Sequence, residues 1–268
     1  MAHLVPQLCL AEEVCRSQMF HRLAEQLQVH RENEVEKNSC SIISDFGVID
    51  SVSVQNDQST SFNRRKRRAA VLICLFEGQD GELRVILTKR SMKLSTYPGD
   101  VALPGGKVEE GDADDSATAL RETMEEIGLE PNLVQIVAYL EPSISQHLLR
   151  VVPVVGLLAK KEDFRPSLNT DEVDAIFDVP LEMFLKEENH RCEEREWMGR
   201  KYILHLFDFE CEKGVFLIWG LTASILISAA SVIYQRSPCF KSHLPDFQQL
   251  QRSLQNIVEQ EICISVLK

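Results

Sequence analysis

The sequence has no closely spaced cysteine pairs, although it contains eight cysteines. They stand at positions 9, 15, 40, 74, 192, 211, 239 and 263. None forms a CxxC pair or a Cys/His cluster with the spacing of zinc ligands. Scattered thiols of this kind indicate a reduced, intracellular protein. Cys74 lies in an apolar run, where a thiol behaves as a small core side chain.

The chain also lacks an excess of positive charge, since 41 acidic and 29 basic residues give a formal net charge of −12. Broad binding to nucleic acid or to an anionic membrane requires a positive field, so the composition argues against both partners. A small anionic substrate stays compatible, because a few cations and a bound metal can reverse the local potential.

The N-terminus lacks the apolar core of a secretory signal. Arginines within the first 31 residues suggest an organelle transit peptide, but the glutamates among them weaken that signal. We therefore expect a cytoplasmic protein, with a mitochondrial location as the alternative.

The first 65 residues precede the segment that we expect to fold as a domain. Apolar residues at helical spacing predict a short amphipathic helix over 17–30, and the Ser-, Asn- and Gln-rich stretch 51–63 indicates a flexible linker. The basic run 64–68 is compatible with a nuclear-localisation-like patch or an anion contact. We favour a solvated lead-in to a strand.

Regular structure is expected from the apolar run 69–78, which predicts a buried strand with 83–90 as its hairpin partner. Further strands are expected at 133–141, 149–159 and 172–181 and near 202–209, with helices at about 114–128 and 216–234. Mixed strands and helices with short connections predict one α/β domain. We place it at 66–236, between an extension (1–65) and a C-terminal tail (237–268).

Residues 215–234 contain no charge over a length that could cross a membrane. Their Ser, Thr and Gly content lowers the hydrophobicity, and neither flank is strongly basic. We therefore expect a buried core helix rather than a transmembrane span.

The most informative residues are three glutamates on the helix at 114–128. Glu122, Glu125 and Glu126 stand at i, i+3 and i+4 and so share one face. Clustered carboxylates repel one another, but they suit hard divalent cations such as Mg²⁺ and Mn²⁺. The alternative is a solvated acidic face, which is the usual meaning of a Glu-rich helix.

The flanking residues favour the metal site. Gly105 and Gly106 follow Leu103-Pro104 in a tight turn, where the backbone can approach a ligand or offer a carbonyl to a metal. Arg121 directly precedes Glu122 and can fix the direction of a carboxylate by charge-assisted hydrogen bonds.

Residues 103–129 resemble the Nudix box, the signature of hydrolases that act on nucleoside diphosphates linked to another group. The match is strong over RETMEEIGL and PGG, but the loop between them is one residue longer, so the acid near its middle falls on Asp112. The longer loop is similar to that of the coenzyme A branch of the family. The resemblance covers about 68–236 and is closest to plant members.

A second segment supports this branch. LTKRSMKLSTYPGDVALPGG (87–106) is similar to the upstream coenzyme A motif, but Ser95 stands where Arg is common and Tyr97 where His is common. The resemblance makes Arg90 and Lys89 candidate phosphate contacts, and a bidentate arginine would suit the 3′-phosphate of coenzyme A. Because adjacent strand residues face opposite ways, we expect only one of these two to point inward. Ser91 and Gly105 complete the candidate substrate-binding residues.

The resemblance implies an α/β/α Nudix sandwich with a mixed sheet and hydrolysis of a diphosphate by water, with Mg²⁺ or Mn²⁺ as cofactor. Coenzyme A would yield 4′-phosphopantetheine and 3′,5′-ADP. The implied metal ligands are Glu122 and Glu126, with Glu125 as a further ligand and the Gly106 carbonyl as another. Arg121 would orient a carboxylate, and Glu172 is the candidate general base.

Two other functions stay open at this point. A broader diphosphatase would act on ADP-ribose, dinucleotides or oxidised nucleotides. A catalytically silent domain would bind a ligand or a partner, but it would be expected to have lost box acids that are all present here. A homodimer is also left open.

Overall fold

The apolar run that opens the domain forms strand β1 (Arg68–Glu77), and the next segment forms β2 (Leu83–Arg90). The two strands pair antiparallel, and Gly78 N–H donates to the Glu82 carbonyl at 2.8 Å in the turn, which confirms the predicted hairpin. The structure is a computed structural model that describes residues 23, 25, 27, 68–145, 149–197 and 200–242.

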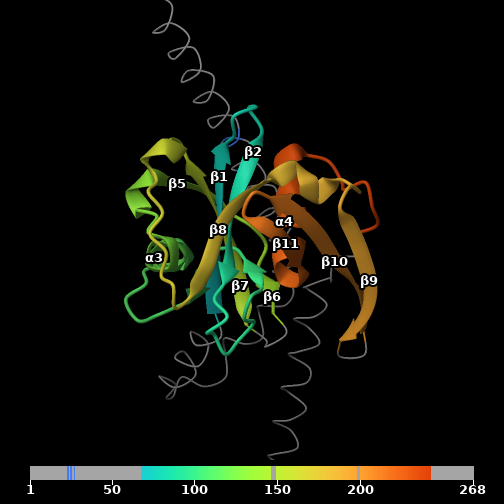
Figure 1. Ribbon diagram of the computed structural model, residues 1–268, viewed down its shortest axis with the longest axis horizontal. Coiled ribbons are helices and arrows are strands. Elements are labelled where there is room, and N and C mark those ends of the chain that lie inside the picture. The colour runs from blue at the N-terminus through green and yellow to red at the C-terminus, as the bar shows by residue number, and fades with distance from the viewer. Residues whose placement is uncertain are drawn as a thin grey trace, which may run out of the picture.

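A mixed eight-stranded sheet forms around this hairpin (Figure 1). Its main path runs β3-β2-β1-β7-β5, while β4 pairs with β1, β6 with β7 and β8 with β2. The β1–β7 pair is parallel and the other pairs are antiparallel. The additional strands are β3 (Val101–Ala102), β4 (Gly105–Lys107), β5 (Val134–Tyr139), β6 (Ser143–Ile144), β7 (Arg150–Leu158) and β8 (Val173–Pro180).

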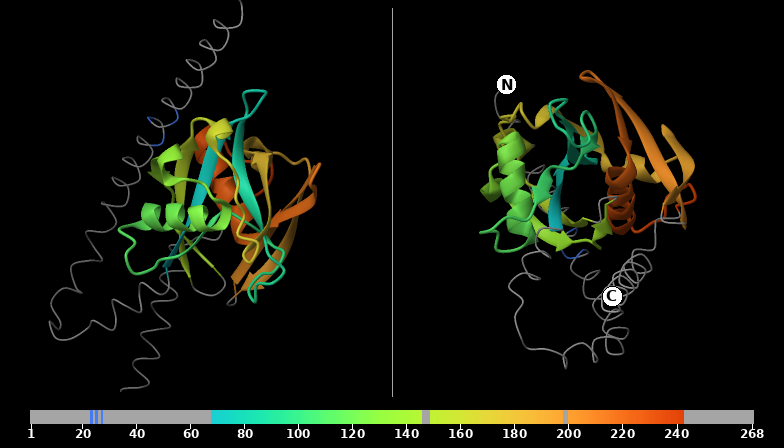
Figure 2. Two further views of the ribbon diagram at one scale, coloured as in Figure 1. Left: turned by 60° about the vertical axis from the view of Figure 1, so that its left-hand side comes forward. Right: turned by 90° about the horizontal axis from the view of Figure 1, so that it is seen from below.

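One helix covers each face of this sheet (Figure 2). Helix α3 (Asp115–Ile127) packs with Leu72 and Phe76 of β1, while α4 (Gly220–Tyr234) packs on the other side with Ile73 and Leu75. Strand β1 is therefore buried on both faces, which explains its continuous apolar sequence. Each fully buried large aliphatic side chain contributes about 1.5–3 kcal/mol to stability. The predicted α/β sandwich with a mixed sheet is confirmed.

Three short 3₁₀ helices complete the connections: η1 (Pro131–Leu133), η2 (Lys161–Asp163) and η3 (Leu181–Leu185). Cys74 is fully buried, as predicted, and burial raises the pKa of its thiol to about 12.

A second sheet, of three antiparallel strands, lies beyond α4 and corrects two sequence predictions (Figure 1). It consists of β9 (His190–Trp197), β10 (Arg200–Cys211) and β11 (Gly214–Trp219). The predicted helix at 216–234 was wrong in its first residues, because these belong to β11 and the helix begins at Gly220, whose φ of +61° marks the junction. The strand expected near 202–209 is longer than predicted, and β9 was missed.

Helix α4 is a packed core helix, as predicted. Its buried side chains include Ile225, Leu226 and Ile227. Within the described parts of the chain, every helix is too short or too polar to span a membrane.

The segments flanking the domain contribute to its packing where they are described. In the predicted helix at 17–30, residues 23, 25 and 27 are helical, and Leu23 and Leu27 are buried in the α4-side core. The linker expected at 51–63 and most of the basic run lie outside the described residues. On the C-terminal side, Phe240 stacks on His190 with ring centroids 3.8 Å apart, so packing continues past residue 236.

Candidate functional site

Helix α3 carries the three glutamates, and local signals define both of its ends. The Asp114 side chain accepts a hydrogen bond from the Ala117 N–H at 2.9 Å, which caps the N-terminus. Gly128 closes the helix in the left-handed region at φ +73°, and its N–H donates to the Met124 carbonyl at 2.9 Å. These two caps determine where the helix begins and ends, and so which turn of it carries the acidic face.

Glu122 lies directly against the glycine turn. A Cβ on Gly106 would overlap the Glu122 carboxyl group, so this carboxyl packs on the Gly106 backbone. Burial raises the pKa of Glu122, although the neighbouring Arg121 guanidinium opposes that shift. Glycine at 106 therefore leaves room for this carboxyl group, which a larger residue would displace.

Glu126 is the most buried acid of the face, with only 6% of its surface exposed. Its Oε2 accepts a hydrogen bond from the Gly105 N–H at 3.4 Å. The pKa of Glu126 is raised to about 8, mainly by burial and in smaller part by the charges of Glu122 and Glu172. The Gly105 hydrogen bond and the charge of Arg90 oppose the shift. A buried carboxyl with this little compensation would be stabilised in its charged form by a nearby cation.

Glu125 differs from the other two, since its side chain is 54% exposed. Its Oε2 accepts from Arg121 Nη1 at 3.2 Å. The structure thus divides the predicted three-acid face into an inner pair, the buried Glu126 and the partly buried Glu122, and an outer acid held by arginine.

Arg121 is at the centre of the acidic network. Its Nε and Nη2 donate to the two oxygens of Asp112 at 2.9 and 3.1 Å, and its Nη2 also donates to the Lys107 carbonyl at 3.1 Å. Its Nη1 lies 3.2 Å from Glu122 Oε1. This places Arg121 where the sequence predicted it, in contact with the carboxylates that it would orient.

Asp112 is a residue to which the sequence assigned no role. Besides Arg121, it accepts from Thr118 Oγ1 at 2.8 Å and from the Glu109 N–H at 2.9 Å. The hydrogen bonds from Arg121 lower the pKa of Asp112 to about 2. Asp112 therefore anchors Arg121 and closes the loop before α3, and its place as the acid of that loop was the available signal.

The end of β2 meets this helix through Arg90. Arg90 pairs with Val173 in the α3-side core, and Lys89 pairs with Ala175, which packs on the α4-side core. Because paired strand residues share a face, Arg90 faces α3 and Lys89 faces away from it. The charge of Arg90 acts on Glu126, in agreement with this placement. Of the two candidate phosphate contacts, the structure brings Arg90 to the acidic helix.

Ser91 and Glu172 join β2 to the loop before β8. Ser91 is fully buried, its N–H donates to the Glu172 carbonyl at 2.8 Å, and its hydroxyl donates to the Thr170 carbonyl at 3.4 Å. Ser91 therefore holds this loop in place. The Glu172 charge raises the pKa of Glu126, so the candidate base lies within electrostatic reach of the buried acid.

The oxygen groups around Gly106 fit a magnesium-like ion. Within the described residues, no three Asp, Glu, His or Cys side chains already converge on one point. Mg²⁺ does not need such a cage, because it keeps several waters and binds one or two carboxylates together with substrate phosphates. Glu122, Glu126 and the Gly106 carbonyl would be the groups to hold such an ion.

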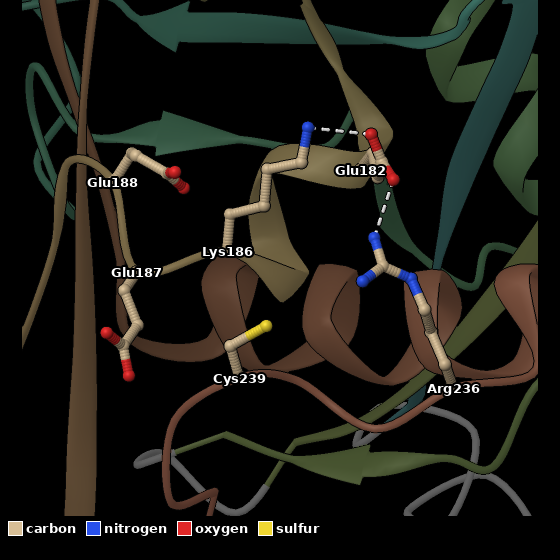
Figure 3. A pocket seen from close by; sticks show the side chains of 6 residues that line it. All are labelled: Glu182, Lys186, Glu187, Glu188, Arg236 and Cys239. Atoms are coloured by element: carbon tan, nitrogen blue, oxygen red, sulfur yellow. Dashed lines mark hydrogen bonds and ion pairs between the residues drawn. The ribbon is translucent and has the colours of Figure 1, made fainter.

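A surface hollow of about 370 Å³ lies on the other side of the sheet, between η3 and the segment after α4 (Figure 3). Glu182 pairs there with Lys186 at 2.7 Å and with Arg236 at 2.6 Å, so its central charges are largely compensated. No sequence-predicted site residue lines this hollow, which is formed by Glu182, Lys186, Glu187, Glu188, Arg236 and Cys239.

Comparison with known proteins gives close relatives. The chain is 57% identical over 207 residues to "Nudix hydrolase 15, mitochondrial" of Arabidopsis thaliana, covering 77% of this chain and 72% of the relative. It is 59% identical over 184 residues to "Nudix hydrolase 22, chloroplastic" of the same plant, covering 69% of this chain and 61% of the relative. "Peroxisomal coenzyme A diphosphatase NUDT7" of Mus musculus is 38% identical over 190 residues, covering 70% of this chain and 79% of the relative.

Solved structures are more distant. A Caenorhabditis elegans Ap4A hydrolase binary complex matches 42% of this chain and 80% of its own at 22% identity and a TM-score of 0.36. The NUDIX domain of Shewanella oneidensis NrtR with ADP ribose matches 48% of this chain and 82% of its own, at 20% identity and a TM-score of 0.37.

The family assignment rests on sequence. The model of the NUDIX domain matches residues 66–203, over the segment that carries both the glycine turn and the acidic helix. The resemblance of the sequence to plant members of the family agrees with the two Arabidopsis relatives. The chain belongs to the Nudix hydrolases, a family that acts on pyrophosphate bonds.

Proposed function

We propose that this hydrolase cleaves the diphosphate of coenzyme A or its derivatives into 4′-phosphopantetheine and 3′,5′-ADP. The observation that carries the proposal is the position of Arg90, whose strand partner Val173 lies in the core beside α3 and whose charge acts on Glu126. This position supports a single site in which the segment that resembles the coenzyme A motif meets the acidic helix. The 38% identity to a mouse coenzyme A diphosphatase supports the same substrate class.

Each side chain has a defined task in this proposal. Glu122 and Glu126 would hold Mg²⁺ or Mn²⁺ with the Gly106 carbonyl, and Glu125 would be a further ligand. Bound metal supplies neutralisation of the phosphate charge and activation of water. Arg121, anchored by Asp112, would keep Glu122 oriented, and Glu172 would accept the proton of the attacking water.

Recognition of the substrate would depend on Arg90. A planar guanidinium can bind two phosphate oxygens, whereas an ammonium group is a point charge. Arg90 would therefore bind the 3′-phosphate that distinguishes coenzyme A from simpler nucleotides. Gly105 would line the same turn.

A substrate panel tests this proposal. The purified protein is incubated with coenzyme A, acyl-coenzyme A, ADP-ribose, NADH and 8-oxo-nucleotides, each with Mg²⁺ or Mn²⁺, and products are resolved by mass. We expect 3′,5′-ADP and 4′-phosphopantetheine to form with the highest kcat/KM. A tenfold preference for ADP-ribose or NADH would favour the broader diphosphatase, and no turnover of any substrate would favour a silent binding domain.

The names of the relatives favour an organelle over the expected cytoplasmic location. One is described as mitochondrial, one as chloroplastic and one as peroxisomal. We therefore propose the mitochondrial alternative, and imaging of the full chain with a C-terminal fluorescent protein would test it. Diffuse cytosolic fluorescence would contradict it.

A further inference from the structure

The loop between β2 and β3, residues 91–100, presents two large apolar side chains to solvent. Met92 is 66% exposed and Tyr97 is 40% exposed. A Cβ on Gly99 would overlap the Met92 sulfur, so the thioether lies over the glycine two residues after Tyr97. Exposed apolar groups gathered in one short loop indicate a contact surface rather than a packing role.

Tyr97 also has a strained backbone. Its φ of +53° lies in the left-handed region, which bulky side chains rarely adopt. The other described non-glycine residues with positive φ are Asn189 and Gln235, so Tyr97 is the aromatic residue among them. Strain of this kind is found at sites where a side chain must be presented in one direction.

Hydrogen bonds at both ends of the loop maintain this conformation. Arg90 N–H donates to the Asp100 carbonyl at 2.8 Å, and Gly99 N–H donates to the Arg90 carbonyl at 3.1 Å. Met92 N–H donates to Asp174 Oδ2 at 3.2 Å, which ties the loop to β8. These hydrogen bonds stabilise the loop in this conformation.

The loop is joined directly to the acidic site. Arg90 Nη2 donates to the carbonyl of Thr96, the residue before Tyr97, at 3.4 Å. The same guanidinium acts electrostatically on Glu126. Arg90 thus links the loop to the acidic helix, because it bonds to the loop backbone beside Tyr97 and its charge acts on the buried Glu126.

We propose that Tyr97 stacks on the purine base of the substrate and that Met92 flanks it, which makes this loop the base-recognition subsite. The inference rests on the proposed function. If Arg90 binds the 3′-phosphate of a nucleoside, the base of that nucleoside lies on the adjacent loop. A base offers a planar π face to an exposed aromatic ring, a contact that tolerates any base but requires an aromatic partner.

Titration of the full-length protein with 3′,5′-ADP and, separately, with 4′-phosphopantetheine tests the subsite. We expect Tyr97→Ala to weaken 3′,5′-ADP binding about 10-fold, because stacking on one aromatic ring contributes an effect of that order. Tyr97→Phe and Tyr97→Trp should retain binding. Tyr139→Ala, which removes a tyrosine of similar exposure (38%) on β5, is the matched control and should bind as the wild type does.

A glycine variant separates strain from recognition. Tyr97→Gly removes the backbone strain that Tyr97→Ala keeps, so its thermal midpoint should be at least as high, yet it should bind 3′,5′-ADP as weakly. Unchanged 3′,5′-ADP affinity in Tyr97→Ala would overturn the subsite alone. Weakened binding of 4′-phosphopantetheine instead would place the other half of the substrate on the loop and also overturn it. A wild-type protein that neither binds 3′,5′-ADP nor cleaves coenzyme A would defeat the proposed function as well.

Discussion

Arg121 and Asp112 form a two-point ion pair, with Nε–Oδ1 at 2.9 Å and Nη2–Oδ2 at 3.1 Å. A bidentate pair fixes the plane of the guanidinium as well as its position. Its remaining nitrogen, Nη1, faces Glu122 and Glu125 at 3.2 Å each. The loop acid therefore determines how the arginine meets the acids of the helix.

This relationship predicts a positioning role for Asp112. Asp112→Ala should lower kcat about 10- to 100-fold and raise the Mg²⁺ concentration needed for half-maximal rate, because Arg121 loses the anchor that orients it. The metal titration is the informative readout, since a purely structural residue would lower the amount of folded enzyme and leave the Mg²⁺ midpoint unchanged. Asp112→Glu should partly restore the midpoint.

The glycine turn gives a paired prediction. Gly106→Ala places a Cβ against the flexible end of Glu122, so the protein should keep its thermal midpoint but lose activity as that carboxyl is displaced. Gly105→Ala places a Cβ against the Ala70 carbonyl at φ +144° and should destabilise the fold by about 1–3 kcal/mol. Calorimetry and rate measurements on both variants check this. Equal losses of stability in Gly105→Ala and Gly106→Ala would contradict the different roles assigned to the two glycines.

Substrate recognition predicts a difference between neighbouring residues of β2. Arg90→Ala should lower kcat/KM for coenzyme A roughly 10- to 150-fold, the effect of one charge-assisted hydrogen bond of about 1.5–3 kcal/mol. Dephospho-coenzyme A should be nearly unaffected. Lys89→Ala is the matched control, because alternation directs Lys89 to the other face. Equal effects of Arg90→Ala on both substrates would exclude the 3′-phosphate contact.

A histidine pair outside the site predicts the pH dependence of stability. His190 Nε2 and His205 Nδ1 lie 3.0 Å apart, and His205 is fully buried. Burial, and secondarily His190, lowers the pKa of His205 to about 4. In the unfolded chain the pKa returns to about 6.5. As the pH falls from about 6.5 to about 4, the unfolded state therefore gains a proton that the folded state does not, and the free energy of unfolding decreases.

The decrease should approach about 3 kcal/mol for His205 alone, because a tenfold difference in proton affinity between the two states corresponds to about 1.4 kcal/mol. Urea denaturation at pH 7.5 and at pH 5 measures most of this decrease in the free energy of unfolding. His205→Phe should lose less stability than the wild type between these two conditions. Identical losses in the two proteins would show that other groups determine the acid sensitivity.

The parts of the fold that the sequence predicts are those with strong local signals. The hairpin of β1 and β2 follows from two apolar runs around a Gly-containing turn, and α3 follows from Asp114 and Gly128 at its ends. The acidic face was predictable because helix geometry alone puts Glu122 and Glu126 one turn apart.

The missed elements lack such signals. Strand β9 has the sequence HRCEEREW, in which apolar residues do not alternate with polar ones, because its side chains are mostly exposed. It is a strand because it pairs with β10 along its whole length. Strand β11 merges with α4 in one uncharged run, and only the backbone at Gly220 separates them. In the site, the split between buried Glu126 and exposed Glu125 depends on tertiary packing and could not be predicted from spacing.

The rate of coenzyme A hydrolysis by Glu122→Gln and Glu126→Gln at limiting Mg²⁺ tests the proposed metal site most directly. Each change keeps the shape of the side chain and removes a ligand charge, so turnover should fall about tenfold to a thousandfold, since metal stabilisation contributes several kcal/mol. Glu125→Gln, on the exposed side of the helix, should have a smaller effect. Full turnover by both Glu122→Gln and Glu126→Gln would contradict the assignment of this pair to the metal.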